Sequence, residues 1–373
     1  MSPTLYLTDI ITILIIFSYF FIIKKRNFDF RTLLFLAPFS LGFLVAYNFY
    51  AFLYGFMKLL EFIFLGLIIV DKFSITNKVL SVLSFTVIFE SILVIAQFLN
   101  HGSLGSFLYF LGERTFTSQT PGIANASIAG QLILRPYATF SHPNVLAGYL
   151  VIIMSLLFIA GSNKIKKKEI LLRTIAITSG SIALLLTLSR VAIFVWLIIL
   201  TIELLRKLNK NKFIILSLFL ILIITIWFVL FSSFSKRFSL SDLGNESTVQ
   251  RVYFIDNSIK IIAANPIFGV GLNNYFYYSP SNSKNNILPI QPVHNIYLLI
   301  LTQSGVLGFG AFLYLVLKTF KKISLFKNKQ KKMVFYYTFF ALLFLGLFDH
   351  YLLTIQQGQL LLTTVFAFYW SKN

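Results

Sequence analysis

The sequence alternates long apolar stretches with short clusters of charged residues. A transmembrane helix needs about 20 apolar residues, and shorter runs cross the bilayer when they pack among neighbours. No stretch resembles a separate soluble domain, so we interpret residues 1–373 as a single integral membrane domain. The pattern predicts an all-α polytopic membrane protein with about eleven transmembrane helices, at residues 6–23, 32–47, 49–70, 79–99, 145–161, 170–187, 191–205, 213–234, 296–318, 334–350 and 355–370.

One largely apolar run covers residues 170–205. As a single helix it would be about 54 Å long, whereas the hydrocarbon core of a bilayer is about 30 Å thick. The run must therefore contain two spans, and we place the turn between them near Ser189 and Arg190.

The composition also indicates a membrane protein. Of the 373 residues, 57% are hydrophobic and 12% are charged, whereas a soluble protein carries about 25% charged residues. The net charge of +20 would suggest a nucleic-acid partner in a soluble protein, but here the positions of the charges matter more, and we expect no nucleic acid. The chain has no Cys, which excludes disulfides and thiolate metal sites.

Positive charges are distributed unevenly between the predicted loops. The predicted inner segments and the C-terminal tail hold 23 of the 32 Lys and Arg residues, and the predicted outer segments hold 8. Because Lys and Arg accumulate on the cytoplasmic side, we expect the N-terminus outside and the C-terminus in the cytoplasm. The first apolar run is followed, not preceded, by its positive charges, so we expect a retained span rather than a cleaved signal.

Two predicted outer segments are much longer than the others, namely a first outer loop at residues 100–144 and a large outer loop at residues 235–295. Loops longer than about 15 residues are usually functional or disordered, and these two contain too many apolar residues to be disordered. We therefore expect the chemistry of the protein on the outer face, chiefly in the second loop.

The first outer loop ends in the sequence LRPYATFSHPNVLAGYL, residues 134–150. Arg135 precedes a proline, and Pro143 disfavours helix at His142, so His142 and Pro143 mark the entry into the next span. Asn144 is the candidate cap of that helix. The His-Pro-Asn sequence is either a helix-start device alone or part of a site.

Two further arginines belong to the same predicted face. Arg190 lies at the tip of a hairpin so apolar that it needs no charge for solubility. A charge at membrane depth indicates a functional site by default, and snorkelling towards lipid phosphate is the alternative. Arg251 falls in the first turn of a predicted amphipathic helix, in which apolar residues from Val252 to Ile262 recur at helical spacing. We expect this helix to lie on the membrane surface.

His294 precedes the ninth predicted span, and its neighbour Asn295 is a candidate cap for that helix. An imidazole titrates near neutral pH and suits general acid–base work on a hydroxyl, although a hydrogen-bonded surface histidine is the ordinary alternative. Arg135, Arg190 and Arg251 share its predicted face, and arginine binds phosphate oxygens bidentately while staying charged. Such a cluster would stabilise a pyrophosphate leaving group without a metal.

Carboxylates in the predicted outer loops do not form a cluster that resembles a metal cage. We therefore expect no metal site and no cofactor. The residues are Glu113, Asp242, Glu246 and Asp256, which are dispersed along the chain.

Ionisable residues within the predicted spans support a different class of function, a transporter or flippase of lipid-linked sugars without catalysis. Glu61 lies three positions after Lys58, so these two residues can form an ion pair on one helix. Asp349 and His350 lie near an outer helix end, and Glu90 has no explanation at the level of sequence.

Four elements, RPYATFSHPNVLAGYL, LTLSR, QRVYFIDNSIKIIAANPIFGVGLNNY and VHNIYLLILTQSGVLGFGAF, occur in an order that resembles the O-antigen ligase and O-antigen polymerase superfamily. The resemblance covers roughly residues 80–350. It implies an all-helical glycosyltransferase of the bacterial inner (cytoplasmic) membrane, metal-independent and inverting, that acts in lipopolysaccharide or other surface polysaccharide biosynthesis.

The resemblance also implies partners and residue roles. The donor would be a glycan on undecaprenyl pyrophosphate, and the acceptor would be the lipid A core for a ligase or the next lipid-linked repeat for a polymerase. Arg135, Arg190 and Arg251 would bind the pyrophosphate, and His294 with Arg251 would be catalytic. A related branch transfers glycans to protein, and the sequence does not separate these activities.

Overall fold

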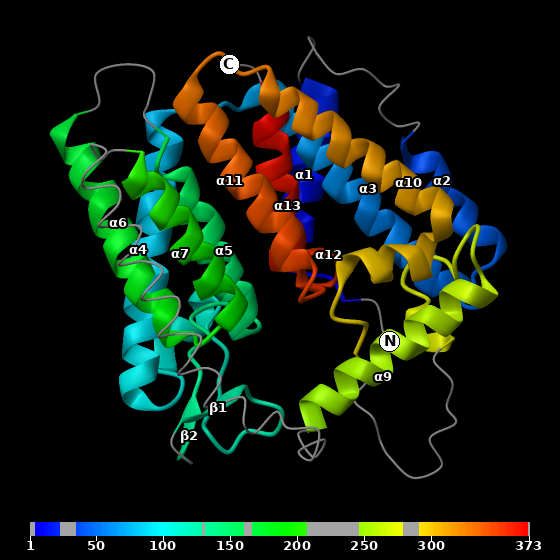
Figure 1. The fold of residues 1–373 in the computed structure, drawn as a ribbon, viewed down its shortest axis with the longest axis horizontal. Helices are drawn as coiled ribbons and strands as arrows, with labels where there is room; N and C mark the ends of the chain where they lie inside the picture. The colour runs from blue at the N-terminus through cyan, green and yellow to red at the C-terminus, as the bar shows by residue number, and fades with distance from the viewer. Residues whose placement is uncertain are drawn as a thin grey trace.

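The computed structural model describes residues 4–22, 35–128, 131–159, 166–206, 246–278 and 291–371. Its long helices form a bundle (Figure 1). They are α1 (Leu7–Ile22), α3 (Phe49–Lys72), α4 (Asn77–Asn100), α5 (Pro143–Leu156), α6 (Lys167–Leu186), α7 (Arg190–Leu205), α10 (Ile296–Ser324), α11 (Lys329–Gly346) and α13 (Gln356–Trp370). By length and composition, α3, α4, α6 and α10 are able to cross a membrane.

The expected helical membrane fold is therefore supported, but the count of eleven spans is not confirmed. The turn predicted near Ser189 and Arg190 is present, because α6 ends at Leu186 and α7 begins at Arg190. The predicted span at 213–234 lies outside the described residues.

The described part of the predicted span at 32–47 is not one continuous helix. It consists of the short helix α2 (Ala37–Ser40) and the 3₁₀ helix η2 (Leu41–Leu44). The following residue Asn48 is tied to the turn after α9, because its N–H donates to Asn274 Oδ1 (2.8 Å) and its carbonyl accepts from Asn274 Nδ2 (3.2 Å). Apolar content predicted a span here, whereas these contacts hold a short, broken segment.

The first outer loop contains a β-hairpin, so the described chain is not entirely helical. The strands β1 (Asn125–Ile128) and β2 (Gln131–Leu134) pair antiparallel. β2 leads directly into Arg135 and the start of α5.

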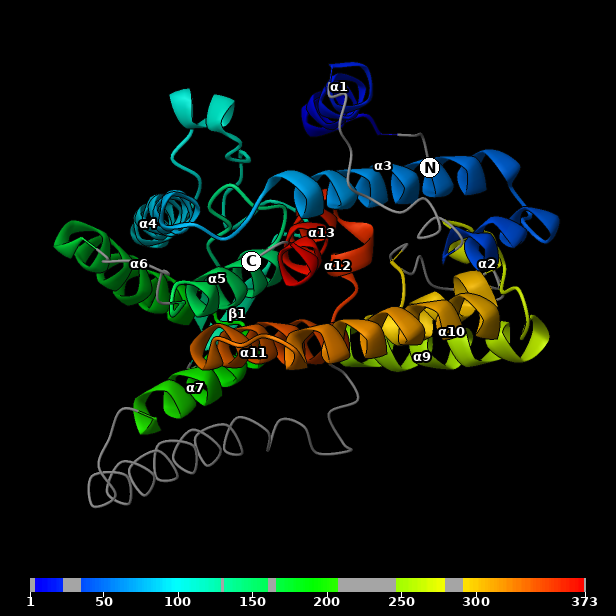
Figure 2. The ribbon, with the colours of Figure 1, turned by 90° about the horizontal axis from the view of Figure 1, so that it is seen from above.

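Helix α5 is the central helix of the bundle. All its residues except Asn144 and Tyr149 are buried, and it packs against α4, α6, α7, α11 and α13. Seen from above, α5 lies between α6 and α13, while α1 and α3 lie on the far side of α13 (Figure 2). Helix α5 therefore lies in the interior of the bundle.

Five of the described helices begin at a capping side chain that accepts a hydrogen bond from a first-turn N–H, which has no partner within the helix. The capping residues are Asn48, Thr76, His142, Asn295 and Asn328. The cap predicted at Asn295 is thus confirmed.

Helix α9 (Glu246–Ala264) carries apolar residues on two sides. Phe254 and Ile261 are buried against the bundle, whereas Val252, Ile255 and Ile259 are exposed. The stripe predicted to face the membrane surface therefore points away from the protein.

Helix α10 is interrupted at Gly305, whose backbone (φ 60°, ψ −165°) is not helical. The turn after α9 fits into this interruption, where the N–H of Val306 donates to the carbonyl of Pro266 (2.9 Å). A Cβ on Gly305 would overlap the carbonyl of Ile267, and a Cβ on Gly269 (φ 65°) would overlap the backbone of α10. The glycines of the NPIFGVG sequence thus serve close backbone packing.

Gly305→Ala is expected to lower the stability of the bundle. The added methyl group would overlap Ile267, and the backbone conformation is one that only glycine adopts readily, a strain of about 1–3 kcal/mol. Gly310→Ala is the matched control, because an added Cβ there has no atom within 4 Å. In thermal unfolding of the detergent-solubilised protein, only Gly305→Ala should melt at a lower temperature. Equal melting temperatures would contradict this packing.

Candidate active site

The loop that carries Arg135 and His142 is folded into the end of the bundle. Gln97 of α4 is fully buried beneath it, and its Oε1 accepts hydrogen bonds from the N–H groups of Tyr137 (2.9 Å) and Ala138 (2.7 Å). Its Nε2 donates to the Ala138 carbonyl (3.2 Å) and to Glu113 Oε1 (2.7 Å). Ala138 has φ 48°, so these bonds stabilise a backbone conformation that alanine rarely adopts.

Two more polar side chains in the helices hold the same loop. Glu90 of α4 accepts hydrogen bonds from Thr139, one from Oγ1 (2.7 Å) and one from the N–H (3.2 Å). Gln357 of α13 accepts from the N–H of Ser141 (3.0 Å) and donates to the carbonyl of Thr139 (2.9 Å). Glu90, unexplained by the sequence, therefore anchors the loop that leads into α5.

Arg135 is largely buried and joins two helix ends. Its Nε donates to the carbonyl of Thr187, directly after α6 (2.7 Å), and its Nη2 donates to Asn144 Oδ1 (2.7 Å). Its guanidinium therefore has two protein partners before any ligand binds.

Asn144 does not cap α5 as the sequence suggested. The cap is His142, whose Nδ1 accepts a hydrogen bond from the Asn144 N–H (3.1 Å), with Pro143 at the first helical position. The Asn144 side chain is thus available to link Arg135 to Asp349, whose Oδ2 accepts from Asn144 Nδ2 at 3.0 Å.

Asp349 connects this chain of contacts to His294. Its Oδ1 lies 3.6 Å from His294 Nδ1, and His294 Nε2 lies 3.2 Å from Gln291 Oε1. Burial alone would raise the pKa of the Asp349 carboxyl, but the His294 and His350 rings and the Asn144 amide hold that pKa well below its usual range. Asp349 is therefore ionised at neutral pH and faces His294 with a negative charge.

Two other histidines surround this pair. The His350 ring lies 4.8 Å from the His294 ring, and His350 Nδ1 lies 2.6 Å from Thr354 Oγ1 in the short helix α12 (Tyr351–Thr354). Burial lowers the pKa of His350 to about 4, against the opposing effect of Asp349. Burial, and then Arg135, lower the pKa of His142 to about 4. Both rings are neutral at pH 7.

The three predicted arginines lie close enough for their charges to act on one another. Arg190 is the first residue of α7, and Arg251 is an exposed residue of α9. Burial lowers the pKa of Arg135 to about 10, and the charges of Arg190 and Arg251 contribute to this shift. The side chain of Ser189 makes no capping hydrogen bond to α7. The N-terminus of α7 thus offers backbone N–H groups and the positive end of the helix dipole beside Arg190, which suits it to binding an anion.

Sequence reasoning missed two members of this site, Asn144 as a link and Asp349 as the partner of His294. In the sequence, Asp349 is only an ionisable residue near an outer helix end, and it lies outside the two long outer loops. His294, Asp349 and His350 also form a group whose ligating atoms lie within 4.8 Å of one another, so these side chains are able to hold a metal ion.

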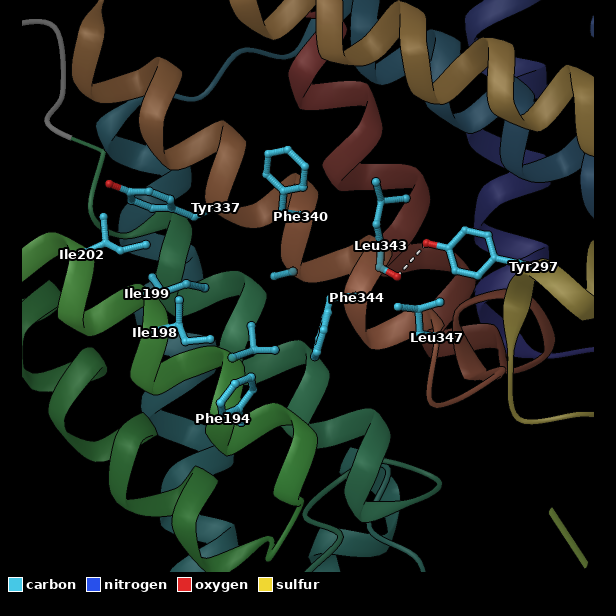
Figure 3. A pocket seen from close by; sticks show the side chains of 12 residues that line it. Phe194, Ile198, Ile199, Ile202, Tyr297, Tyr337, Phe340, Leu343, Phe344 and Leu347 are labelled. Carbon is cyan, nitrogen blue, oxygen red and sulfur yellow. Dashed lines mark hydrogen bonds between the residues drawn. The ribbon is translucent and has the colours of Figure 1, made fainter. Parts of the chain in front are cut away.

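An apolar groove of about 390 Å³ lies between α7 and α11. Figure 3 shows Phe194, Ile198 and Ile202 of α7 facing Phe340 and Phe344 of α11 across it. One end of the groove is formed by Leu347 and Tyr297, which are close in sequence to Asp349 and His294. One end of the groove therefore lies near the helix ends that carry Asp349 and His294.

Glu90→Leu is expected to destabilise the protein, because the partly buried N–H and hydroxyl of Thr139 would lose their acceptors. An unsatisfied buried group costs about 1–3 kcal/mol. Phe89→Leu, one position earlier on an exposed face of α4, is the control and should melt like the wild type. A Glu90→Leu protein as stable as this control would show that the carboxylate does not anchor the loop.

Comparison with protein families finds a match for the central part of the chain. Residues 174–313 match the family model described as O-antigen ligase. This is more than a third of the chain, and it contains Arg190, Arg251 and His294 but neither Arg135 nor Asp349. No curated protein matches the chain.

Proposed function

From its membership of the O-antigen ligase and polymerase superfamily, we propose that this protein is a membrane glycosyltransferase. It moves a glycan from undecaprenyl pyrophosphate to a hydroxyl of the lipid A core or of the next lipid-linked repeat. The observation that supports this most is the convergence of three arginines and a carboxylate-paired histidine at one end of an apolar bundle.

The arginines bind the pyrophosphate in this proposal. Arg190 and Arg251 take the phosphate oxygens, assisted by the N-terminus of α7, and stabilise the charge that develops as the glycosidic oxygen leaves. Arg135 contributes its charge and positions the loop, since its Nε and Nη2 are already bonded to protein groups.

His294 acts on the acceptor. In the tautomer that carries its hydrogen on Nδ1, facing Asp349, and with the acceptor hydroxyl in place of Gln291 Oε1 at Nε2, the ring takes the proton of that hydroxyl on Nε2. The hydroxyl oxygen attacks the anomeric carbon, the bond from that carbon to the pyrophosphate breaks, and undecaprenyl pyrophosphate leaves with inverted stereochemistry at the sugar. This sequence of bond changes uses no metal ion.

The groove between α7 and α11 fits the carrier lipid. Its lining is apolar and aromatic, and one end lies beside the site, as a donor with a charged head and a long hydrocarbon tail requires. The periplasmic side of a bacterial inner membrane is the location where such a donor and its acceptors meet.

The runner-up function is lipid-linked sugar transport without catalysis, which the intramembrane charges suggested. Each of these charges has local partners: Lys58 contacts Asp9 and Glu61, and Glu90 holds Thr139. Lys58 also donates to Gln356 of α13 (3.2 Å), so this cluster joins three helices. These contacts favour structural roles and leave the glycosyltransferase as the better-supported function.

Arg251→Ala is expected to slow glycan transfer roughly 10²–10³-fold, the usual loss when one donor to a developing negative charge is removed. Lys260→Ala is the matched control, because it removes an exposed positive charge from the same helix. Both variants are compared in liposomes containing undecaprenyl-pyrophosphate oligosaccharide, with products resolved by size. Equal activities would show that only the general positive charge of α9 matters.

His294→Ala is expected to slow transfer roughly 10²–10⁴-fold, as loss of a general base does, while donor binding survives. His101→Asn is the control, because residue 101 is exposed and has φ 51°, a conformation that asparagine tolerates. A ladder of repeats from the wild type indicates a polymerase, and transfer only after addition of lipid A core indicates a ligase. Movement of the lipid across the bilayer without transfer, equal in wild type and mutant, would support the flippase.

Ile198→Trp is expected to weaken use of a long-tailed donor by filling the groove, raising KM severalfold, while a short-tailed donor analogue is used as before. Ile182→Trp, which adds the same bulk at an exposed position of α6 outside the groove, is the control. Transfer rates measured with the two donors provide the comparison. The groove is not the tail site if both donors are affected equally.

A further inference from the structure

His294 Nδ1 is a buried nitrogen atom without a hydrogen-bond partner among the described residues. It faces Asp349 Oδ1 at 3.6 Å, beyond hydrogen-bond distance. The other ring nitrogen, Nε2, lies 3.2 Å from the side-chain oxygen Oε1 of Gln291. When Nε2 donates its hydrogen to Gln291, Nδ1 carries a lone pair.

In this tautomer, the alternative to the one that acts as the base, the lone pair faces a carboxylate oxygen and is repelled by it unless a positive charge lies between them. His350 lies against the same point, with its ring 4.8 Å from that of His294. Its Nδ1 is already bonded to Thr354, so its Nε2 is the nitrogen that remains for a ligand. One ligand atom from each of His294, Asp349 and His350 lies within 4.8 Å of the other two.

We propose that His294, Asp349 and His350 form a binding site for a late first-row divalent ion such as Zn²⁺, through His294 Nδ1, Asp349 Oδ1 and His350 Nε2. This proposal extends the proposed function, because it names an inhibitor of the same site. Gln291, Thr354 and Asn144 hold these three side chains in place through their hydrogen bonds.

The ligand chemistry selects the class of ion. Zn²⁺ and the other late first-row divalent ions prefer imidazole nitrogen with carboxylate, whereas Mg²⁺ and Ca²⁺ prefer oxygen ligands. Tetrahedral Zn²⁺ places its ligand atoms roughly 3.4 Å apart. The ligating atoms here lie within 4.8 Å of one another, and His294 Nδ1 lies 3.6 Å from Asp349 Oδ1. The three side chains therefore need to approach one another by about an ångström or somewhat more to hold the ion. Three protein ligands leave a fourth position for water.

A metal ion bound at this site prevents His294 from acting as a base. A metal on Nδ1 leaves the ring proton on Nε2, so that nitrogen has no lone pair to accept a proton from the acceptor hydroxyl. The ion and the transfer reaction therefore compete for one imidazole, and Zn²⁺ is an inhibitor that a chelator removes.

The first test measures metal binding on the purified full chain in detergent, without a histidine tag and without any glycan. Co²⁺ serves as the spectroscopic probe and Zn²⁺ as its competitor. We expect one Co²⁺ per chain, with the intense visible absorption of a four- or five-coordinate ion, displaced by Zn²⁺. His350→Ala should lose this signal, and His101→Asn, which removes a histidine outside the site, should keep it.

Thr354→Val provides a second variant that retains all three ligands. It removes the hydrogen-bond partner of His350 and should weaken binding roughly 10–100-fold, as loss of an outer-shell partner does. Thermal unfolding without metal verifies that His350→Ala and Thr354→Val are folded. No saturable Co²⁺ binding by the wild type, or equal binding by folded His350→Ala, would overturn the site.

The second test adds Zn²⁺ to the liposome transfer assay, where inhibition relieved by EDTA is expected. Co²⁺ bound by the three residues together with transfer insensitive to Zn²⁺ would leave the metal site standing and refute His294 as the base. An absence of Co²⁺ binding with transfer still dependent on His294 would refute the metal site alone. The two proposals therefore fail separately.

Discussion

Backbone groups inside a membrane bundle have no water to bond, so an irregular loop persists there only if the protein supplies every partner. In the loop from Arg135 to His142, polar side chains of the helices below it supply partners for the backbone of residues 137, 138, 139 and 141. Gln97 and Glu90 of α4 and Gln357 of α13 provide its donors and acceptors. Because the loop is held from two helices, it presents Arg135 and His142 in fixed positions, and the geometry of the site follows from this anchoring.

The site is built from the ends of helices rather than from their faces. The end of α6, the starts of α5 and α7, and the junction between α11 and α12 all meet at the Arg135–Asn144–Asp349–His294 chain of contacts. Helix ends carry unpaired backbone groups and a dipole, which suits them to binding charged ligands. The interruption of α10 at Gly305 serves the same arrangement, because the turn after α9 packs into it and so holds α9, with Arg251, against α10.

Much of this arrangement followed from the sequence, because its signals are local. Apolar runs located most of the described helices within a few residues, and the length of the 170–205 run required the turn at Arg190. The cap at Asn295 follows from one side chain and the helix after it. The prediction of a span at 32–47 was wrong, because apolar content indicates burial or lipid contact without specifying a regular helix. The prediction that Asn144 caps α5 was wrong, because His142 takes that position two residues earlier.

The sequence by itself determined the class of protein, the helices and the candidate arginines and histidine, since hydropathy and charge act through neighbours along the chain. Only the tertiary structure decided which of these residues meet and what supports them. Asn144 and Asp349 are 205 residues apart, and Glu90 and Thr139 are 49 apart, yet each pair forms a hydrogen bond in the folded bundle. No local pattern encodes such pairs, because a side chain's partner depends on how the helices pack. Packing therefore turned separate polar residues into one site.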